Sequence, residues 1–182
     1  MTEENTGAVS EDGVFEREEI IARLERLGLR MPEPKEAVGN YKPGVIHGNL
    51  LYVSGHGPWL GDFPIIGKVG VTMSADEGQF AAQVVALGIL ATVDKLVGFQ
   101  RIDRLVESFG LVNASTSFTS HPAIIDGYSD VMAAAFGSDR GVGARTAIGV
   151  SSLPYGIPVE VKCIFALRDD KSSSATAVKA WL

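Results

Sequence analysis

The sequence predicts a single α+β domain, in which a mixed β-sheet carries two helices on one face. The chain has 182 residues, of which 46% are hydrophobic and 21% charged, so it can bury one sizeable core. Segments with strand and helix patterns follow one another in the order strand, strand, strand, helix, strand, helix, strand, strand. This order favours two packed layers over a repeat array or a disordered chain.

The predicted domain covers residues 15–168. Residues 1–14 are rich in Glu, Thr, Ser and Gly, so we expect a disordered leader there. A short helix is predicted over 15–27, because apolar residues recur at three- and four-residue spacing and Gly28 can end it. Residues 169–182 are expected to form a tail that begins as a linker and ends in a few apolar residues.

Turn residues and apolar runs place the next elements. The segment 45–54 predicts two short strands around the turn His47-Gly48-Asn49, and a third strand or loop is expected near 65–71. Ser74-Ala-Asp-Glu is a capping box, and the helix that it starts should continue to about Val97 with apolar residues on much of its circumference. A strand over 104–112 and a second helix over 122–136 follow.

The last two strands, 145–151 and 157–167, are separated by the turn-forming segment 152–156. If they form a hairpin, Glu160 pairs near Gly149, which is about four residues or roughly 13 Å along the strand from Arg145. Arg145 and Glu160 of one chain then do not meet, and a pocket that uses both draws on two chains. The strands also carry more apolar residues than two helices need, so we expect the second sheet face to close against copies of the chain: Val45, Leu51, Val53, Ile148, Val150, Val159, Val161 and Phe165.

Charge and cysteine content exclude several classes of protein. Sixteen Lys and Arg against twenty-two Asp and Glu give a net charge of -6, which opposes binding to nucleic acid or to anionic membranes. The most apolar run, 84–93, is about half the length that crosses a bilayer. The single cysteine, Cys163, allows no intrachain disulfide and fits a buried packing residue, so a cytoplasmic protein is expected. The three histidines, His47, His56 and His121, lack the spacing of a metal site, and we expect no metal.

Two segments carry a chemical signal. In Tyr52-Val53-Ser54-Gly55-His56, a strand ends in small residues whose backbone can approach a ligand closely. In the second, Arg145-Thr146 leads to Leu153-Pro154 and then Val159-Glu160-Val161, so that an arginine and a glutamate stand on strands otherwise built for burial. Arginine offers a planar two-donor fork that matches a carboxylate, and a glutamate can hold a water or move a proton.

These patterns resemble the YjgF/YER057c/UK114 family, also called the Rid family and long labelled L-PSP endoribonuclease. The resemblance covers residues 41–167, with Tyr41 thirteen positions before Ser54 and Arg145 fifteen before Glu160. It implies a chorismate-mutase-like α+β fold assembled as a homotrimer, with ligand clefts between subunits. Active members hydrolyse an enamine or imine derived from an amino acid to a 2-keto acid and ammonia, without a cofactor.

The resemblance also implies roles for single residues. Arg145 would clamp the carboxylate of a small substrate, Glu160 would position or polarise water, and Tyr41 with Ser54 and Gly55 would shape the pocket. Tyr128 is a further pocket candidate, although both tyrosines also fit packing aromatics. Without the family pattern, Arg145 would be read as a strand residue in a salt bridge, for example to Asp139.

The chain departs from the family pattern at three positions. Ala147 stands where active deaminases carry Cys, His56 where they carry Gln, and Ile125 where they carry an asparagine in the helix. His56 could titrate near neutral pH and act as an acid or base, or could simply lie at the surface. Three functions therefore stay open: an imine deaminase, a non-catalytic protein that binds 2-keto acids, and an endoribonuclease.

Overall fold

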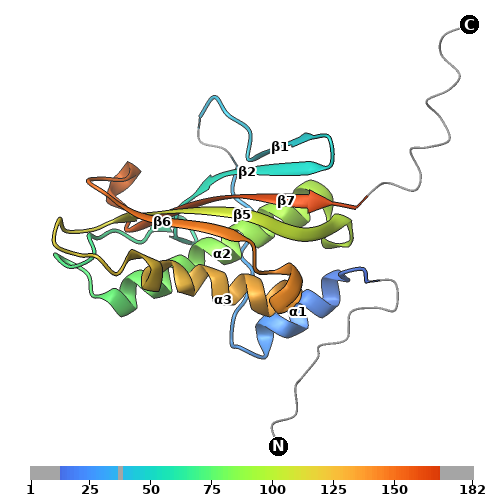
Figure 1. The fold of residues 1–182 in the computed structure, drawn as a ribbon, viewed down its shortest axis with the longest axis horizontal. Coiled ribbons are helices and arrows are strands. Elements are labelled where there is room, and N and C mark those ends of the chain that lie inside the picture. Colours follow the sequence, from blue (N-terminus) through green and yellow to red (C-terminus); the bar gives the residue numbers. More distant parts are fainter. Residues whose placement is uncertain (1–12, 37–38, 169–182) are drawn as a thin grey trace, which may run out of the picture.

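In a computed structural model, residues 13–36 and 39–168 are described, and they form a five-stranded sheet with its helices on one side (Figure 1). The strand order is β1-β2-β7-β5-β6, with all pairs antiparallel except β5 and β6. This confirms the predicted α+β fold with a mixed sheet. The predicted leader lies outside the described residues except for Gly13 and Val14, and the predicted tail lies outside them entirely.

The strands and helices have the following bounds: α1 Arg17–Glu25, β1 Gly44–His47, β2 Leu50–His56, β3 Trp59–Leu60, β4 Phe63–Pro64, α2 Ala75–Val97, β5 Ile102–Asn113, α3 His121–Arg140, β6 Ala144–Val150 and β7 Val159–Leu167. Short 3-10 turns cover Phe99–Arg101 and Pro154–Gly156. Of the strand or loop expected near 65–71, the structure shows the loop, and the two-residue strands β3 and β4 before it form a small separate hairpin. In 65–71, Val69 makes only isolated bridges, to Met73 and Ala114.

Helix α2 is the centre of the core. The predicted capping box is present, since the Ser74 hydroxyl accepts from the Glu77 amide while the Glu77 carboxylate accepts from the Ser74 amide. The helix is long and apolar enough to cross a membrane by length and composition, but 61% of its most apolar window is buried inside the domain. It packs on β2 and β7 beside α3, which packs on β5 and β6, and Gly127 brings α3 within contact of the Gln79 backbone.

The extra helix α1 lies on the far side of α3 and belongs to the same core (Figure 1). Phe15 and Ile20 are fully buried, and the Phe15 ring packs edge-on against Phe136 of α3. The carbonyl of Gly13 accepts hydrogen bonds from Arg140 and Arg168. The end of the predicted leader is therefore held against the domain.

The predicted hairpin of the last two strands is wrong. Strand β7 inserts between β2 and β5, while β6 pairs with the other edge of β5 and runs parallel to it. Glu160 is paired with Leu111, which is in turn paired with Ile148, so the sheet separates Glu160 from β6 by one strand. A turn-forming composition can mark a crossover as well as a hairpin.

The sheet has one covered face and one open face. Of the apolar strand residues expected to leave a face uncovered, most are buried against the helices: Leu51, Val53, Val159, Val161 and Phe165. The open face carries two of the expected residues, Val45 and Ile148, which are exposed as is Tyr52, with Phe109 and Ile164 half-buried beside them. An apolar face without cover is still present, as expected, with charged residues such as Glu160 and Lys162 in its centre.

Candidate functional site

The first group of predicted residues meets at the end of β2, and we call Ser54, Gly55 and Glu160 the glutamate half-site. Strand β2 has an irregular register between Val53 and His56, which is typical of a β-bulge. Gly55 lies in this bulge, and a Cβ built on it would stand 2.1 Å from a carboxylate oxygen of Glu160. Any side chain there would displace Glu160, so the glycine is what allows the carboxylate to lie against the β2 backbone.

Tyr41 is tied to the same half-site through its neighbours. The Ser54 hydroxyl donates to the Lys42 carbonyl at 2.7 Å, and the Ser54 amide donates to the Pro43 carbonyl at 2.9 Å. Tyr41 itself is 55% exposed. The segment that begins at Tyr41 therefore runs beside Ser54, as the predicted pocket requires.

Glu160 is half-buried on the open face of the sheet. Loss of solvent raises the pKa of its carboxyl above the ordinary glutamate value. A carboxyl with a raised pKa can both accept and return a proton closer to neutral pH, which suits a group that activates water.

Arg145 lies in a second group, which we call the arginine half-site and define as Arg145, Asp126 and Ser129. Its Nη1 donates to the Asp126 carboxylate at 2.7 Å and to the Ser129 hydroxyl at 2.9 Å. The expected alternative partner, Asp139, instead pairs with Arg104. Among the described residues, Nε and Nη2 of Arg145 make no hydrogen bond, and these two donors are the fork that a carboxylate can accept.

The two half-sites do not meet within one chain. Arg145 is paired with Ser108 and, across β5, with Cys163, which is three residues beyond Glu160 on β7. This places the Cα atoms of Arg145 and Glu160 about 10 Å apart along the strands and about 9.5 Å apart across them. Arg145 also contacts α3 on the covered face, whereas Glu160 lies on the open face. The expectation that they do not meet holds, although the hairpin from which it was argued does not exist.

Two of the residues singled out from the sequence, Tyr128 and Ile125, lie in the core, and Ala147 packs against it. Tyr128 is fully buried, and its hydroxyl is 3.0 Å from that of Ser108, so it does not line a surface pocket as predicted. Burial raises the pKa of the Tyr128 hydroxyl well above its usual value and that of the Cys163 thiol to about 12. Ile125 is also buried and packs on Gly110, while Ala147 is half-buried against the core. Cys163 therefore has the inert packing environment that was expected.

His56 is not a surface histidine. Its Nδ1 donates to the Ser54 carbonyl at 2.8 Å, and its Nε2 is 2.8 Å from the Thr92 hydroxyl of α2. Burial lowers the pKa of the His56 imidazole, which leaves it neutral at pH 7. In this position His56 clamps the bulge of β2 onto α2, and the proton transfer suggested for it has no support from its contacts.

The sequence analysis did not identify Asp126 and Ser129 as partners of Arg145, or Thr92 as the partner of His56. Asp126 and Ser129 lie three residues apart on α3 and so share one helix face, which is a detectable pattern. Their partner Arg145 is on a strand that packs against that face, and only the packing of α3 on β6 reveals it. Thr92 lies in a run of apolar helix residues and gave no signal.

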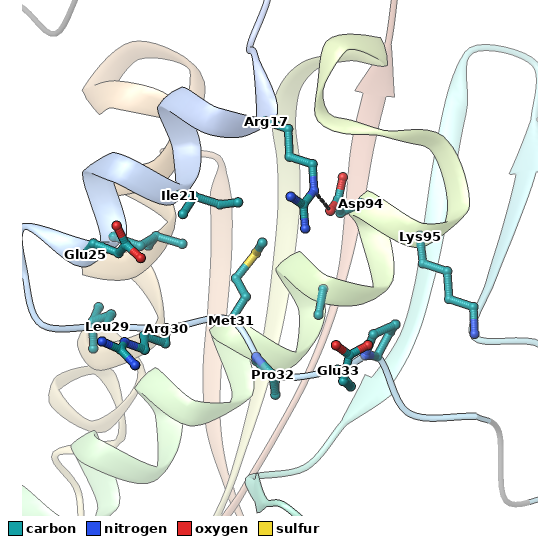
Figure 2. A pocket seen from close by; sticks show the side chains of 13 residues that line it. Arg17, Ile21, Glu25, Leu29, Arg30, Met31, Pro32, Glu33, Asp94 and Lys95 are labelled. Atoms are coloured by element: carbon teal, nitrogen blue, oxygen red, sulfur yellow. Dashed lines mark hydrogen bonds and ion pairs between the residues drawn. The ribbon is translucent and has the colours of Figure 1, made fainter.

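Two hollows among the residues that the structure describes are large enough to note, and neither is lined by the predicted site residues. The larger, of about 500 Å³, lies between α1, the segment 29–34 and the C-terminal half of α2. Figure 2 shows Ile21 and Met31 inside it and the Arg17–Asp94 ion pair at its rim. The smaller, of about 270 Å³, lies where β6 ends beside the start of α3 and includes His121. Among the described residues, no group of three His, Cys, Asp or Glu could hold a metal ion.

Comparison with known proteins identifies a family whose pattern this chain matches. A profile of the family described as "YjgF/chorismate mutase-like, putative endoribonuclease" matches residues 21–167. Protein TCP17 of Trypanosoma cruzi is 35% identical over 153 residues, which are 82% of this chain and 95% of that protein.

Solved structures agree with this match. Protein Atu1372 of Agrobacterium tumefaciens, described as having unknown function, is 34% identical with a TM-score of 0.77, over 82% of this chain and 92% of that one. A "putative endoribonuclease" of Shewanella oneidensis MR-1 is 29% identical with a TM-score of 0.77, over 81% of this chain and 99% of that one. Since the profile match includes every strand and both half-sites, the chain belongs to the YjgF/chorismate mutase-like family.

Proposed function

We propose that the protein hydrolyses enamines or imines of small carboxylate-bearing metabolites to 2-keto acids and ammonia, in clefts between the subunits of a homotrimer. The observation that carries the proposal is that the arginine half-site and the glutamate half-site do not meet within one chain. An arginine whose Nε and Nη2 have no hydrogen-bond partner in the described part of the chain and a half-buried glutamate lie on opposite faces of one chain, so a pocket that uses both must form between two chains. The uncovered apolar face around Glu160 supplies a surface for such contact.

The chemistry needs only these groups. The carboxylate of the substrate would accept from Nε and Nη2 of Arg145, while Asp126 and Ser129 hold the guanidinium in place through Nη1. Glu160 of the neighbouring subunit would accept a proton from water as the oxygen bonds to the imine carbon, and would return it to the leaving nitrogen. The balanced reaction is R–C(=NH)–COO⁻ plus H₂O giving R–CO–COO⁻ plus NH₃. Because the imine is already electrophilic, positioning and proton transfer are sufficient.

The test is release of ammonia or 2-keto acid from 2-aminoacrylate that a dehydratase generates in the assay. We expect the protein to exceed the spontaneous rate and Arg145→Ala to lose at least 90% of that excess, since one charge-assisted bidentate contact contributes roughly 10²-fold. Arg104→Ala is the matched control, because Arg104 is also a surface arginine paired with an aspartate but lies outside both half-sites. No acceleration by well-folded wild type would reject this substrate, and equal loss in both variants would reject the clamp.

A non-catalytic role in binding 2-keto acids is the second candidate. It is favoured by the apolar residues Ala147 and Ile125, which supply no polar group beside the arginine half-site where the resemblance leads us to expect two. Saturable binding of a 2-keto acid that requires Arg145, without turnover of any imine, would select this candidate.

The third candidate, an endoribonuclease, follows from the family description and from the Shewanella relative. The net charge of -6 opposes contact with phosphate backbones. RNA cleavage that is lost in Arg145→Ala and persists through repurification would support it.

A further inference from the structure

The larger hollow has an apolar interior that the proposed function does not use. It measures about 500 Å³ and lies between α1, the segment 29–34 and the C-terminal half of α2. Figure 2 shows the side chains of Ile21 and Met31 inside it, and Ala91 of α2 lines it as well. Pockets that bind a ligand usually measure about 300–1,000 Å³. The size and lining of this hollow therefore favour an occupant with bulky apolar groups.

The charges at the rim of the hollow are balanced. Arg17 bonds Asp94 at 2.6 Å, and Lys95 bonds Glu36 at 2.5 Å. Three of the lining residues are basic and three are acidic: Arg17, Arg30, Lys95, Glu25, Glu33 and Asp94. The rim thus carries no net charge that would attract a small ion, and the apolar interior decides what binds.

The last described residue, Arg168, is held beside the start of α1. Its amide donates to the Arg101 carbonyl at 2.8 Å, and its guanidinium donates to the carbonyl of Gly13. Gly13 comes four residues before Arg17, which lies at the rim of the hollow. Residues 169–182, the predicted tail, therefore continue from a point on the same side of the sheet as the hollow.

The tail is long enough to reach the hollow. Gly13 and Arg17 are at most about 14 Å apart along the chain, and α1 adds about 12 Å from Arg17 to Glu25. With allowance for the Arg168 side chain, Glu25 then lies within about 35 Å of the Arg168 backbone. The thirteen residues from 169 to 181 span up to about 43 Å when extended. Trp181 can therefore be placed anywhere along α1.

The tail also carries the side chains that the hollow requires. Val178, Trp181 and Leu182 recur at three- and four-residue spacing, which would gather them on one side of a helical turn. An apolar stripe of this kind is a common occupant of a groove between helices. The leader 1–12 is the other segment joined to this region, but it is acidic, with Met1 and Val9 as its largest apolar residues. The tail is therefore the better candidate.

We propose that residues 178–182 pack into the hollow of their own chain, with Trp181 and Leu182 against Ile21 and Met31. The tail would then hold α1 and the segment 29–34 onto α2. Removal of an indole and a leucine side chain from water favours this contact, and the covalent connection gives the tail a high effective concentration at the hollow. The inference is independent of the proposed function, because no residue of either half-site lines the hollow.

A disulfide cross-link tests the contact in the full chain. The double variant Met31→Cys with Leu182→Cys is oxidised, and non-reducing electrophoresis with peptide mass spectrometry identifies the product. The native Cys163 does not compete, because it is buried and its pKa is raised to about 12. We expect a link within one chain that forms about tenfold faster than in the control pair Glu18→Cys with Leu182→Cys.

The control pair measures chance encounters of the tail with α1. Glu18 is exposed, lies outside the hollow and is only five residues from Gly13, so a tail without a preferred site would meet it at least as often as Met31. Equal rates for the two pairs would overturn the inference. Links that form mainly between two chains would assign the hollow to the tail of a second copy, and would overturn it as well.

Tryptophan fluorescence provides a test without added cysteines. The chain has two tryptophans, so Trp59→Phe leaves Trp181 as the single reporter. We expect acrylamide to quench it at least about threefold less than free N-acetyltryptophanamide, since a pocket buries about 70–90% of its occupant's surface.

Two further substitutions in the Trp59→Phe chain locate the contact. Met31→Asp places a charge inside the hollow and should raise quenching to the value for the free indole. Leu27→Asp is the matched control, because Leu27 is 59% exposed at the end of α1 and does not line the hollow, and it should change nothing. Full quenching before any further substitution, or shielding that survives Met31→Asp, would overturn the inference.

Discussion

His56 shows how one half-buried residue can shape the site without taking part in its chemistry. Its ring is bonded to the Ser54 carbonyl on one side and to Thr92 of α2 on the other, so it fixes the bulge from which Gly55 faces Glu160. A residue directly after Gly55 can therefore control where the glutamate lies. The glutamine that the family pattern has at this position could make similar contacts as a neutral amide.

Stability should depend on pH through His56. Burial lowers the pKa of the folded-state imidazole below its unfolded value of 6.5, so the unfolded chain binds the proton more tightly. Stability from the neutral ring is thus complete above pH 6.5 and is lost as pH falls below it. We expect Tm to fall between pH 7.5 and 5.5, and to fall less in His56→Gln. An identical pH profile in the variant would contradict this assignment. The raised pKa of Glu160 makes stability rise, not fall, as the pH is lowered. The Tm profile of Glu160→Gln is therefore the second reference, because it removes this opposing contribution.

At the scale of elements, the crossing of α2 and α3 depends on one glycine. A Cβ at Gly127 would stand 2.2 Å from the Gln79 carbonyl oxygen, which is backbone and cannot rotate away. The same crossing sets the position of α3 against β6, and so the position of Asp126 and Ser129 beside Arg145. The geometry of the arginine half-site therefore depends on the packing contact between α2 and α3 at Gly127.

Gly127→Ala should destabilise the protein by about 1–3 kcal/mol, because the helices must separate. Gly88→Ala on α2 is the matched control, since its Cβ would have only His56 as a neighbour, at an ordinary 3.9 Å. Alanine in this helix interior should stabilise by about 0.5–1 kcal/mol. The measurement is urea unfolding at fixed protein concentration, and equal midpoints for the two variants would contradict the close contact.

At the scale of the whole molecule, the decisive feature is that Arg145 and Glu160 lie on opposite faces of one chain, so that in the proposed function each chain contributes to two different clefts. Arg145 on the covered face near the β6 edge and Glu160 on the open face can work together only across subunits. The proposed oligomer would therefore be part of the mechanism as well as a cover for the apolar face.

Subunit mixing tests this division. Trimers of Arg145→Ala and of Glu160→Gln should each be inactive, but after joint unfolding and refolding at equal amounts about a quarter of the clefts would combine an intact arginine with an intact glutamate. We expect imine hydrolysis to return to about a quarter of wild type. Refolded single variants are the control. No recovery in mixed oligomers whose composition is verified would place both residues in one chain's site.

The sequence by itself determined the parts of this protein that depend on neighbouring residues. The capping box at Ser74 and Glu77 predicted the start of α2, and the turn around Gly48 predicted the β1–β2 hairpin. The spacing of Tyr41, Ser54, Arg145 and Glu160 predicted the family, and with it the fold. Each of these signals is local or is a pattern of residue identities, so it can be recognised from the sequence alone.

Only the tertiary structure decided what depends on pairing and packing between distant segments. The insertion of β7 between β2 and β5 replaced the predicted hairpin, because local turn composition does not specify a strand's partner. The bulge in β2 turned His56 toward α2, and simple alternation along the strand cannot show a bulge. Tyr128 became a core residue because α3 presents it to Ser108. The separation of Arg145 and Glu160 onto two faces follows from the same long-range register, which no short stretch of sequence contains.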